Sequence, residues 1–305
     1  MDYSIDGQKQ KMIRINAMQK IAAFRDILIT VLPVLLAPCV YAGSDAFIDF
    51  EATMGFDDNV TRAAQNVDIE HDSFLTVAGT GGMVIMRGNT GTLTAKAMFD
   101  VNTFNRFSDL SHVSAFGKLN YTFGFSSRFG APWFSLDASY GVIEFVSTQR
   151  DSNILSAVAT MGMQIDDATS MRLGLSYRDR DAESSVFDTQ NESFFINLDW
   201  AITSKDIVYI TYKIQTGDTF SSAETVDLTV IDASKAIVDD DVFVGKRTYR
   251  LDATTQFVTL GYNLIRDLHS SFDFSGRYLE SDAEDADLVY EGLTLRLSYF
   301  HRFNL

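Results

Sequence analysis

The sequence predicts an all-β protein: a closed antiparallel transmembrane β-barrel of about 12 strands, with short periplasmic turns and long extracellular loops. Two observations lead to this prediction. Apolar and polar residues alternate with a period of two along many segments, and the connections between these segments are alternately short and long. Together the two features are typical of barrels whose strands have one lipid-facing side and one lumen-facing side.

The last segment of the chain, LTLRLSYFHRFNL, shows the alternation clearly. Leu295 and Leu297 fall on one face, while Arg296 and Ser298 fall on the other. Such a period predicts a strand with two unlike faces. The pattern recurs along the chain, and the predicted strands are 46–56, 73–87, 92–102, 113–125, 134–142, 153–164, 171–180, 193–200, 208–214, 248–264, 272–278 and 293–305.

The connections between these segments differ in length in a regular way. The short connections are 87–91, 126–133, 166–170, 203–206 and 265–269. The longer polar connections are 57–72, 103–111, 146–152, 181–191, 216–247 and 280–288. A soluble β-sandwich is the alternative fold. It is disfavoured because nearly every strand carries charges on its second face, and the sequence offers no helix to cover them.

Residues 1–42 are predicted to be a signal peptide that is removed, which leaves 43–305 as the barrel. Basic residues precede the apolar run ILITVLPVLLAPCV, and the small residue Ala42 follows shortly after it. The run has about 14 residues, whereas a membrane-spanning helix needs roughly 20. Cys39 is the only cysteine and lies within this segment, so we expect no disulfide in the mature chain.

The polar face of the strands collects charges of both signs, and these residues are predicted to line the lumen. The acids are Asp49, Glu51, Asp100, Asp137, Asp199, Asp252 and Asp273. The bases are Lys96, Lys118, Arg172, Arg178, Arg180, Lys213, Arg277, Arg296 and Arg302. One interpretation is a path for small solutes with some preference for anions. The other is an interior filled by salt bridges.

The first functional hypothesis is a pore for passive diffusion of small polar or charged solutes. Loop 216–247 could fold into the lumen as a constriction or extend the barrel outward as a hairpin. The second hypothesis is a non-conducting structural or docking barrel whose acidic extracellular loops bind a surface or secreted partner. Acidic residues concentrate in 55–59, 239–241 and 280–287, either as a solvated rim or as Ca²⁺ ligands, although none has the EF-hand spacing. No metal site and no cofactor is predicted.

A surface hydrolase is the third hypothesis. His71 stands beside Asp72, and His112 lies near Asp109 and two positions before Ser114, a spacing found in lipases built on barrels. Such a lipase needs its histidine and serine on the lipid side, whereas the alternation places His112 and Ser114 on the lumen side. The protein is therefore predicted not to be an enzyme, with no catalytic residue.

The stretch GFDDNVTRA, residues 55–63, resembles the Gly-aromatic-Asp-x-Asn-Val opening of bacterial outer-membrane barrels of the porin type, found near exopolysaccharide and surface-lipoprotein export genes. The resemblance covers nine residues and implies an outer-membrane barrel, without a substrate or site residues. The C-terminal strand also resembles the terminal signal of outer-membrane proteins, with Phe303 two places before Leu305.

The predicted location is the outer membrane of a Gram-negative bacterium. The expected partners are outer-membrane lipid, lipopolysaccharide, small solutes and the barrel-assembly machinery, which would recognise the C-terminal strand. The formal net charge of −16 argues against nucleic acid as a partner, because binding phosphates needs a basic face.

Overall fold

The computed structural model describes residues 46–89, 91–126 and 128–304. The predicted signal peptide lies outside these residues. The strands of the sheet are β1 (Ala46–Asp57), β2 (Asp72–Arg87), β3 (Gly91–Phe104), β4 (His112–Gly124), β5 (Trp133–Phe145), β6 (Ser152–Gln164), β7 (Thr169–Ala182), β8 (Thr189–Ala201), β9 (Asp206–Ala223), β10 (Ala236–Asp239), β11 (Arg247–Ile265), β12 (Ser270–Ala283) and β13 (Leu288–Asn304). The helical elements are η1 (Ser108–Leu110), η2 (Thr148–Arg150), η3 (Ser185–Phe187), α2 (Leu228–Ala233) and η4 (Glu284–Ala286).

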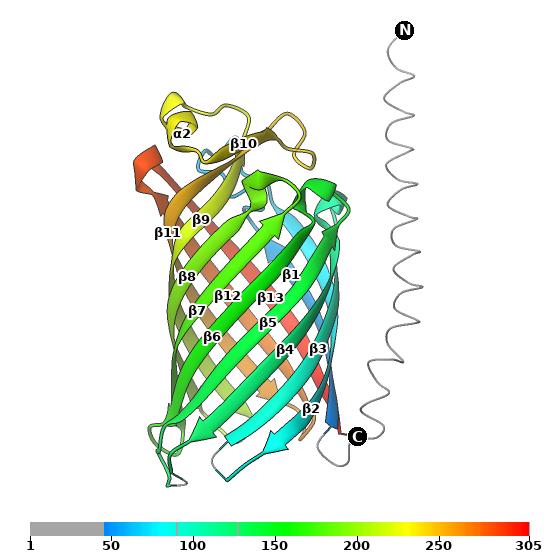
Figure 1. The fold of residues 1–305 in the computed structure, drawn as a ribbon, viewed down its shortest axis with the longest axis vertical. Helices are drawn as coiled ribbons and strands as arrows, with labels where there is room; N and C mark the ends of the chain where they lie inside the picture. The colour runs from blue at the N-terminus through cyan, green and yellow to red at the C-terminus, as the bar shows by residue number, and fades with distance from the viewer. Residues whose placement is uncertain (1–45, 90, 127, 305) are drawn as a thin grey trace.

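The sheet closes into a barrel (Figure 1). All of its pairings are antiparallel, and twelve of its thirteen strands form the ring, because β13 pairs with β1 and β9 pairs with β11. The short strand β10 lies outside the ring, paired with β11 alone. Closure gives every wall strand two neighbours, so its backbone donors and acceptors are paired within the sheet. The predicted closed barrel of about 12 strands is confirmed.

Within the described part of the chain, no helix is long and apolar enough to cross a bilayer.

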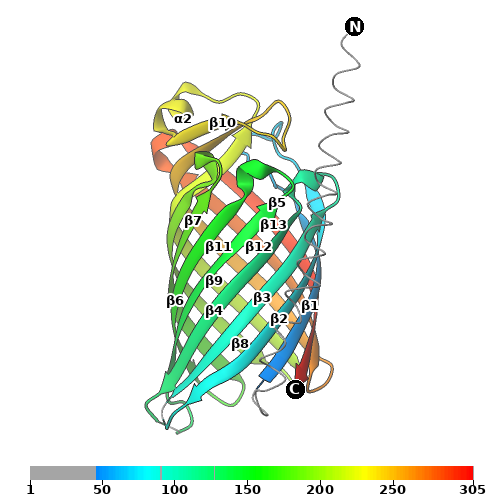
Figure 2. The ribbon, with the colours of Figure 1, turned by 45° about the vertical axis from the view of Figure 1, so that its right-hand side comes forward.

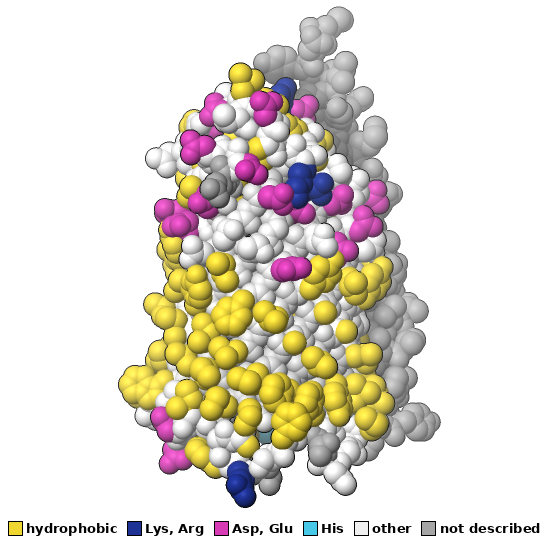
Figure 3. Space-filling model, turned by 60° about the vertical axis from the view of Figure 1, so that its left-hand side comes forward, with side chains coloured by type: hydrophobic (Ala, Val, Ile, Leu, Met, Phe, Trp, Pro, Cys, Tyr) yellow, Lys and Arg dark blue, Asp and Glu magenta, His cyan; other side chains and the backbone are white. Residues whose placement is uncertain are grey.

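The outward face of the wall is apolar. Met54, Leu119 and Leu175 are 57%, 52% and 62% exposed, and they belong to the face that the alternation assigns to lipid. On the face shown in Figure 3, apolar side chains form a belt across the lower part of the barrel, and acidic side chains gather toward the end that carries the long loops. Exposed apolar surface on this scale is favourable only against hydrocarbon, so the belt marks the membrane-spanning part of the wall.

Aromatic rings inside the barrel occupy the space over glycines of neighbouring strands. A Cβ atom added at Gly82 would lie 2.3 Å from the Phe47 ring, and one added at Gly55 would lie 2.3 Å from the Phe74 ring. A glycine is needed at such a position because the ring occupies the space of a side chain. The same arrangement joins Phe116 to Gly141, Trp133 to Gly162, Phe195 to Gly174 and Tyr209 to Gly261.

Strands β9 and β11 continue past their neighbours at the extracellular end (Figure 2). Pairing of β8 with β9 ends at Gly217, whereas β9 and β11 stay paired up to Ala223 and Arg247. Both ends of the predicted loop 216–247 therefore belong to strands. β9 and β11 form a hairpin that extends the barrel outward. Residues 224–246, with α2 and β10, connect the two strands and lie over the upper end of the barrel (Figure 1).

A small apolar core holds this connection on the hairpin. Val230 of α2 is buried against Tyr249 and Leu251 of β11, together with Ala283 and Ala286. A helix as short as α2 is not stable alone, so its packing on the hairpin maintains it. The connection is thereby fixed above the lumen as a packed element.

Candidate functional site

The register places the side chains that were predicted to line the lumen. Paired residues of neighbouring strands point to the same side of a sheet, and the exposed apolar residues identify the lipid side. By this criterion the inward-facing residues are Asp49, Glu51, Lys96, Asp100, Lys118, Asp137, Arg172, Arg178, Arg180, Asp199, Lys213, Asp273, Arg277, Arg296 and Arg302.

The lumen prediction is wrong for Asp252. Its side chain is 61% exposed and its carboxylate lies 2.6 Å from the Lys235 Nζ atom of the extracellular connection. The reason is parity: Asp252 shares the even positions of β11 with Leu260 and Leu264, which are 58% and 37% exposed, and the register of β11 with β9 has no shift between them. Side chains at alternate positions of a strand point to the same side, so Asp252 lies on the outer face of the sheet.

The lower half of the lumen, toward the periplasmic turns, contains paired charges. We call the following contacts the lower ion pairs: Arg302 Nε to Asp49 Oδ1 at 2.6 Å, Lys118 Nζ to Asp137 Oδ1 at 2.8 Å, and Arg172 Nη2 to Asp199 Oδ2 at 3.1 Å. Asp273 accepts a hydrogen bond from the Tyr209 hydroxyl at 3.0 Å. Lys96 lies 5.8 Å from the centroid of the Phe47 ring. Most charges of this half are therefore satisfied by other side chains.

The upper half contains cations without carboxylate partners. We call these residues the upper cation group: Arg178, Arg180, Lys213, Arg277 and Arg296. Across the described part of the chain, none of them forms an ion pair with a carboxylate. Their charges act on one another: Lys213 is repelled by Arg178 and Arg277, and Arg277 by Arg296. The group thus forms a region of positive potential.

Three aromatic rings support this group, and one of them is Phe145, whose centroid lies 5.7 Å from the Arg180 guanidinium. The Lys213 Nζ atom and the Arg277 guanidinium lie 5.0 and 5.7 Å from the centroid of the same Phe257 ring, and Arg296 lies 5.9 Å from that of Phe74. Contacts of this kind stabilise a cation by a small amount without neutralising it. The Arg277 Nε atom is buried and has no hydrogen-bond partner in the described residues.

A cavity of about 420 Å³ lies beside part of the upper cation group. Four basic residues line it, namely Arg62, Arg178, Arg180 and Lys213. Hydroxyl and amide groups complete the wall, from Ser156, Ser176, Ser193, Asn191 and Gln215. The acid at the cavity is Asp218, and its carboxylate already accepts from Lys235 at 2.8 Å and from the Gln190 amide at 3.0 Å. The cavity is therefore polar and positively charged.

Above this cavity, residues 240–246 bind to the loops on other sides of the mouth. Arg150 of the β5–β6 loop donates to Asp240 and Asp241 at 2.9 Å each, and Lys246 donates to Asp68 of the β1–β2 loop at 2.7 Å. We call these five residues the mouth cluster. Arg150 and Asp240 are buried. A buried, hydrogen-bonded pair holds its geometry because loss of either partner leaves an uncompensated charge.

Aromatic rings complete the packing at the mouth. The Arg150 guanidinium lies 4.2 Å from the centroid of the buried Phe187 ring, and Phe243 stands edge-on to Phe107 with centroids 4.9 Å apart. These residues come from the β3–β4, β5–β6 and β7–β8 loops and from the connection. The loops therefore pack as one layer over the upper lumen.

Asp240 is ionised in this layer. Burial by itself would raise the pKa of the Asp240 carboxyl, but the Arg150 charge, the Thr248 hydroxyl and the backbone amides of Phe243 and Val242 together hold that pKa below its ordinary value. The carboxylate accepts from these amides at 3.1 and 2.8 Å. The predicted solvated acidic rim is therefore wrong for Asp240, which is a structural anion.

The motif GFDDN at the end of β1 has a structural role at the same mouth. Asp57 binds Arg62 at 2.7 Å, and the Asn59 amide donates to the carbonyls of Ala63 and Glu291 at 2.9 and 2.7 Å. These bonds shape the β1–β2 loop that carries Asp68 of the mouth cluster. Asp57 is also buried, so the predicted solvated rim is wrong here as well.

Neither histidine of the hydrolase hypothesis forms a triad in the described residues. The His71 ring packs on Phe56, with centroids 5.9 Å apart. The His112 Nδ1 atom lies 3.0 Å from the Leu110 carbonyl, while the Ser114 hydroxyl donates to Asp100. The serine is thus directed to a carboxylate and not to a histidine, which differs from the geometry of an activated nucleophile.

The acidic residues do not gather into a metal site. In the part of the chain that is described, no three His, Cys, Asp or Glu side chains are placed to hold a metal ion. Asp240 and Asp241 instead hold Arg150.

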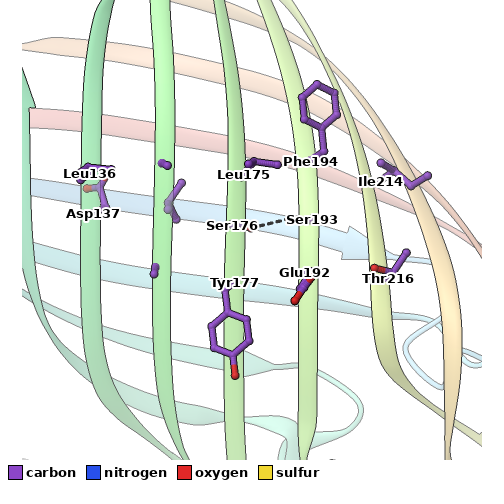
Figure 4. Close-up of a pocket in the computed structure, with 13 residues that line it drawn as sticks. Leu136, Asp137, Leu175, Ser176, Tyr177, Glu192, Ser193, Phe194, Ile214 and Thr216 are labelled. Carbon is purple, nitrogen blue, oxygen red and sulfur yellow. Dashed lines mark hydrogen bonds between the residues drawn. The ribbon is translucent and has the colours of Figure 1, made fainter. Parts of the chain in front are cut away.

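A groove of about 650 Å³ lies on the outer wall (Figure 4). Leu136, Leu175, Phe194 and Ile214 surround it, next to the small residue Ala157. These side chains belong to the apolar face, so the groove meets acyl chains and is separate from the lumen. The Ser176–Ser193 hydrogen bond of 2.6 Å joins two inward-facing residues of the same strands.

Sequence reasoning missed the mouth cluster and the inward aromatic rings. Arg150, Lys246 and Asp68 lie in loops, where no period indicates a neighbour. The rings could have been found, because Phe47, Phe74 and Phe195 fall on the polar parity of their strands, and the glycines that receive these rings are visible in the sequence.

Comparison with known proteins shows the fold. Neither protein-family models nor curated proteins match this chain. Among solved structures, an outer-membrane channel from Pseudomonas putida F1 is 11% identical and aligns over 85% of this chain and 96% of that chain, with a TM-score of 0.54. The translocator domain of an autotransporter from Neisseria meningitidis is 11% identical over 93% of this chain and 98% of that chain, with a TM-score of 0.37. The fold is that of outer-membrane β-barrels.

Proposed function

We propose that this barrel is an outer-membrane pore for passive diffusion of small polar or charged solutes, with a preference for anions. The observation that carries the proposal is the upper cation group. Its residues point inward, and yet Arg178 and Arg296 are exposed to solvent. Inward side chains can be exposed only where the lumen has room for water, which supports a hydrated path lined by unpaired positive charge.

The mouth cluster gives this pore a controlled opening. The connection 224–246 lies over the lumen and is bound to separate loops by Arg150 and Lys246. Release of these contacts would widen the extracellular opening without changing the wall. The solved structure most informative for the fold is described as a channel, which supports the same class of function.

Single-channel recording tests the proposal. The protein is inserted into a planar bilayer in potassium chloride, and the current and reversal potential are measured for the wild type and for the variants Arg178→Gln and Arg277→Gln. We expect steady current steps and a preference for chloride that decreases in both variants. Arg247→Gln, which removes an exposed charge outside the lumen, is the matched control and should keep the wild-type preference.

A non-conducting docking barrel is the second candidate, because the loop layer over the mouth favours it. A correctly folded barrel that gives no current steps would contradict the pore and support this alternative. The acidic extracellular surface would then be the place to search for a partner.

A further inference from the structure

We infer that the cavity beneath the mouth is a binding site for a small oxyanion that carries two or more negative charges. This inference deepens the proposed pore function, on which it rests for the passage of the anion, by naming the class of solute. The inference rests on the basic residues that line the cavity and on the lack of carboxylate partners of three of them, Arg178, Arg180 and Lys213, among the described residues.

Arg178 and Lys213 are available to a ligand. Across the described residues, Arg178 makes no hydrogen bond or ion pair, and the contact of Lys213 is with the Phe257 ring. A guanidinium offers several donors in a planar fork that fits phosphate or carboxylate oxygens, and an ammonium offers three more. Both side chains therefore have their donors free toward the cavity.

Arg180 adds a third cation on the same wall. It lies two residues after Arg178 on β7, so both point inward with about 7 Å between their Cα atoms. Its Nε atom donates to the Ser152 hydroxyl at 3.0 Å and its Nη2 atom to the Arg150 carbonyl at 2.8 Å, which holds the guanidinium in place. Two guanidinium groups at this spacing can reach a single ligand.

The remaining groups of the cavity add no free negative charge. Arg62 is paired with Asp57 at 2.7 Å, and the Ser176 and Ser193 hydroxyls are neutral. The Asp218 carboxylate is held by Lys235 at 2.8 Å. Like charges placed together without counter-ions repel one another, and Lys213 is repelled by both Arg178 and Arg277. A ligand with several negative charges relieves this repulsion more than chloride does, because one ligand neutralises several cations at once.

The size of the site sets an upper limit on the ligand. The cavity volume of about 420 Å³ is at the low end of the range for small-molecule sites. Pyrophosphate fits both this volume and the spacing of the cations, so it is the probe of choice. Inorganic phosphate and a dicarboxylate such as succinate carry less negative charge and have different shapes, so they test how charge and shape contribute.

Binding is measured by calorimetric titration of pyrophosphate into the intact barrel, purified from outer membranes in detergent, at constant ionic strength. The double variant Arg178→Gln with Lys213→Gln should weaken binding about tenfold or more, since each removed group takes away a charge-assisted hydrogen bond. The matched control, Lys205→Gln with Arg247→Gln, removes two exposed charges outside the lumen and should bind as the wild type does. Lys213→Arg keeps the charge and should retain binding.

Unchanged pyrophosphate affinity in the double variant, or an equal loss in the control, would overturn the site. Circular dichroism and the heat-dependent shift in gel mobility show whether each variant has folded. For any variant that does not fold, addition of pyrophosphate to the wild-type pore provides a second test, since a bound anion should reduce the chloride current.

The two measurements separate this inference from the pore itself. Binding without any current would leave the site standing and remove the pore function. Current without binding or block by pyrophosphate would leave the pore standing and remove the site.

Discussion

The upper and lower halves of the lumen are built from the same strands and the same residue types, but they differ in whether their basic side chains are paired with carboxylates. In the lower half, Arg302, Lys118 and Arg172 each bind a carboxylate of a neighbouring strand. In the upper half, the five residues of the upper cation group have no such partner in the described chain. The difference shows that inward charge alone does not define a site. A charge is available to a solute only when the wall leaves it unpaired.

The two halves also differ in what lies above them. The lower ion pairs lie toward the short turns, whereas the upper cation group lies toward the long loops that carry the mouth cluster. Carboxylates are plentiful at the upper end, but they serve the loops: Asp240 and Asp241 bind Arg150, and Asp68 binds Lys246. These carboxylates therefore form ion pairs within the loop layer and do not neutralise the cations of the upper lumen.

The largest expected effect comes from breaking that layer. Asp240→Ala leaves Arg150 buried without its main partner, and removal of one member of a buried pair costs about 3–5 kcal/mol. We expect residues 224–246 to become sensitive to protease and to exchange their backbone amide hydrogens faster, while the barrel wall stays folded. Asp239→Ala is the matched control, because the neighbouring Asp239 side chain is 91% exposed. Equal protease sensitivity in the two variants would mean that the mouth cluster does not hold the connection.

A smaller effect on the free energy of unfolding is expected from single substitutions in the barrel wall, and its sign differs between the lower and the upper half. Lys118→Gln breaks a lower ion pair and should lower the free energy of unfolding by up to about 1 kcal/mol. Arg277→Gln removes an unpaired charge and its repulsion, and should raise the free energy of unfolding by about 1 kcal/mol. Urea unfolding of the barrel in lipid measures both values. A loss of stability in Arg277→Gln would contradict this prediction and would show that the contact with the Phe257 ring outweighs the repulsion.

The smallest effect concerns pH at the mouth, where two carboxyls respond in opposite ways. Burial and the nearby Asp241 charge raise the pKa of Asp109, whereas Asp240 has a pKa below its ordinary value of 3.8. As pH falls through the raised pKa of Asp109, its protonation removes repulsion and should tighten the mouth layer. Asp240 stabilises the closed mouth layer fully at pH values above the ordinary pKa of the carboxyl. Below that pH the carboxyl of the open state binds a proton first, so this stabilisation is lost as pH falls through the lowered pKa of Asp240 in the closed state.

Hydrogen exchange of residues 224–246 from about pH 7 to about pH 3 measures this response once the intrinsic exchange rates are corrected. Protection should first rise and then fall as the solution is acidified. In Asp109→Asn the initial rise should disappear while the fall at low pH remains. A steady loss of protection over the whole range in the wild type would contradict the assignment of Asp109.

Much of the fold could be predicted from the sequence, because the period of two is a local property of each strand. Leu295 and Arg296 take opposite faces in any register, and short turns alternating with long loops set the topology. The same parity placed Arg178 and Asp137 on the inner face. It could not separate them into a free cation and a paired anion, since pairing depends on which residues of two strands lie opposite or diagonal to each other.

Asp240 shows what the local pattern of the sequence could not predict. The sequence by itself determined an alternating chain that must close on itself in lipid, with charges of both signs on its inner face and further acidic residues concentrated in its long loops. The tertiary structure decided which strands leave the ring, which loop carboxylates bind Arg150 and Lys246, and which cations remain free. Those outcomes depend on contacts between residues far apart in the chain, such as Arg150 with Asp240. No period along the sequence encodes such contacts, because closure of the barrel is what brings the loops together.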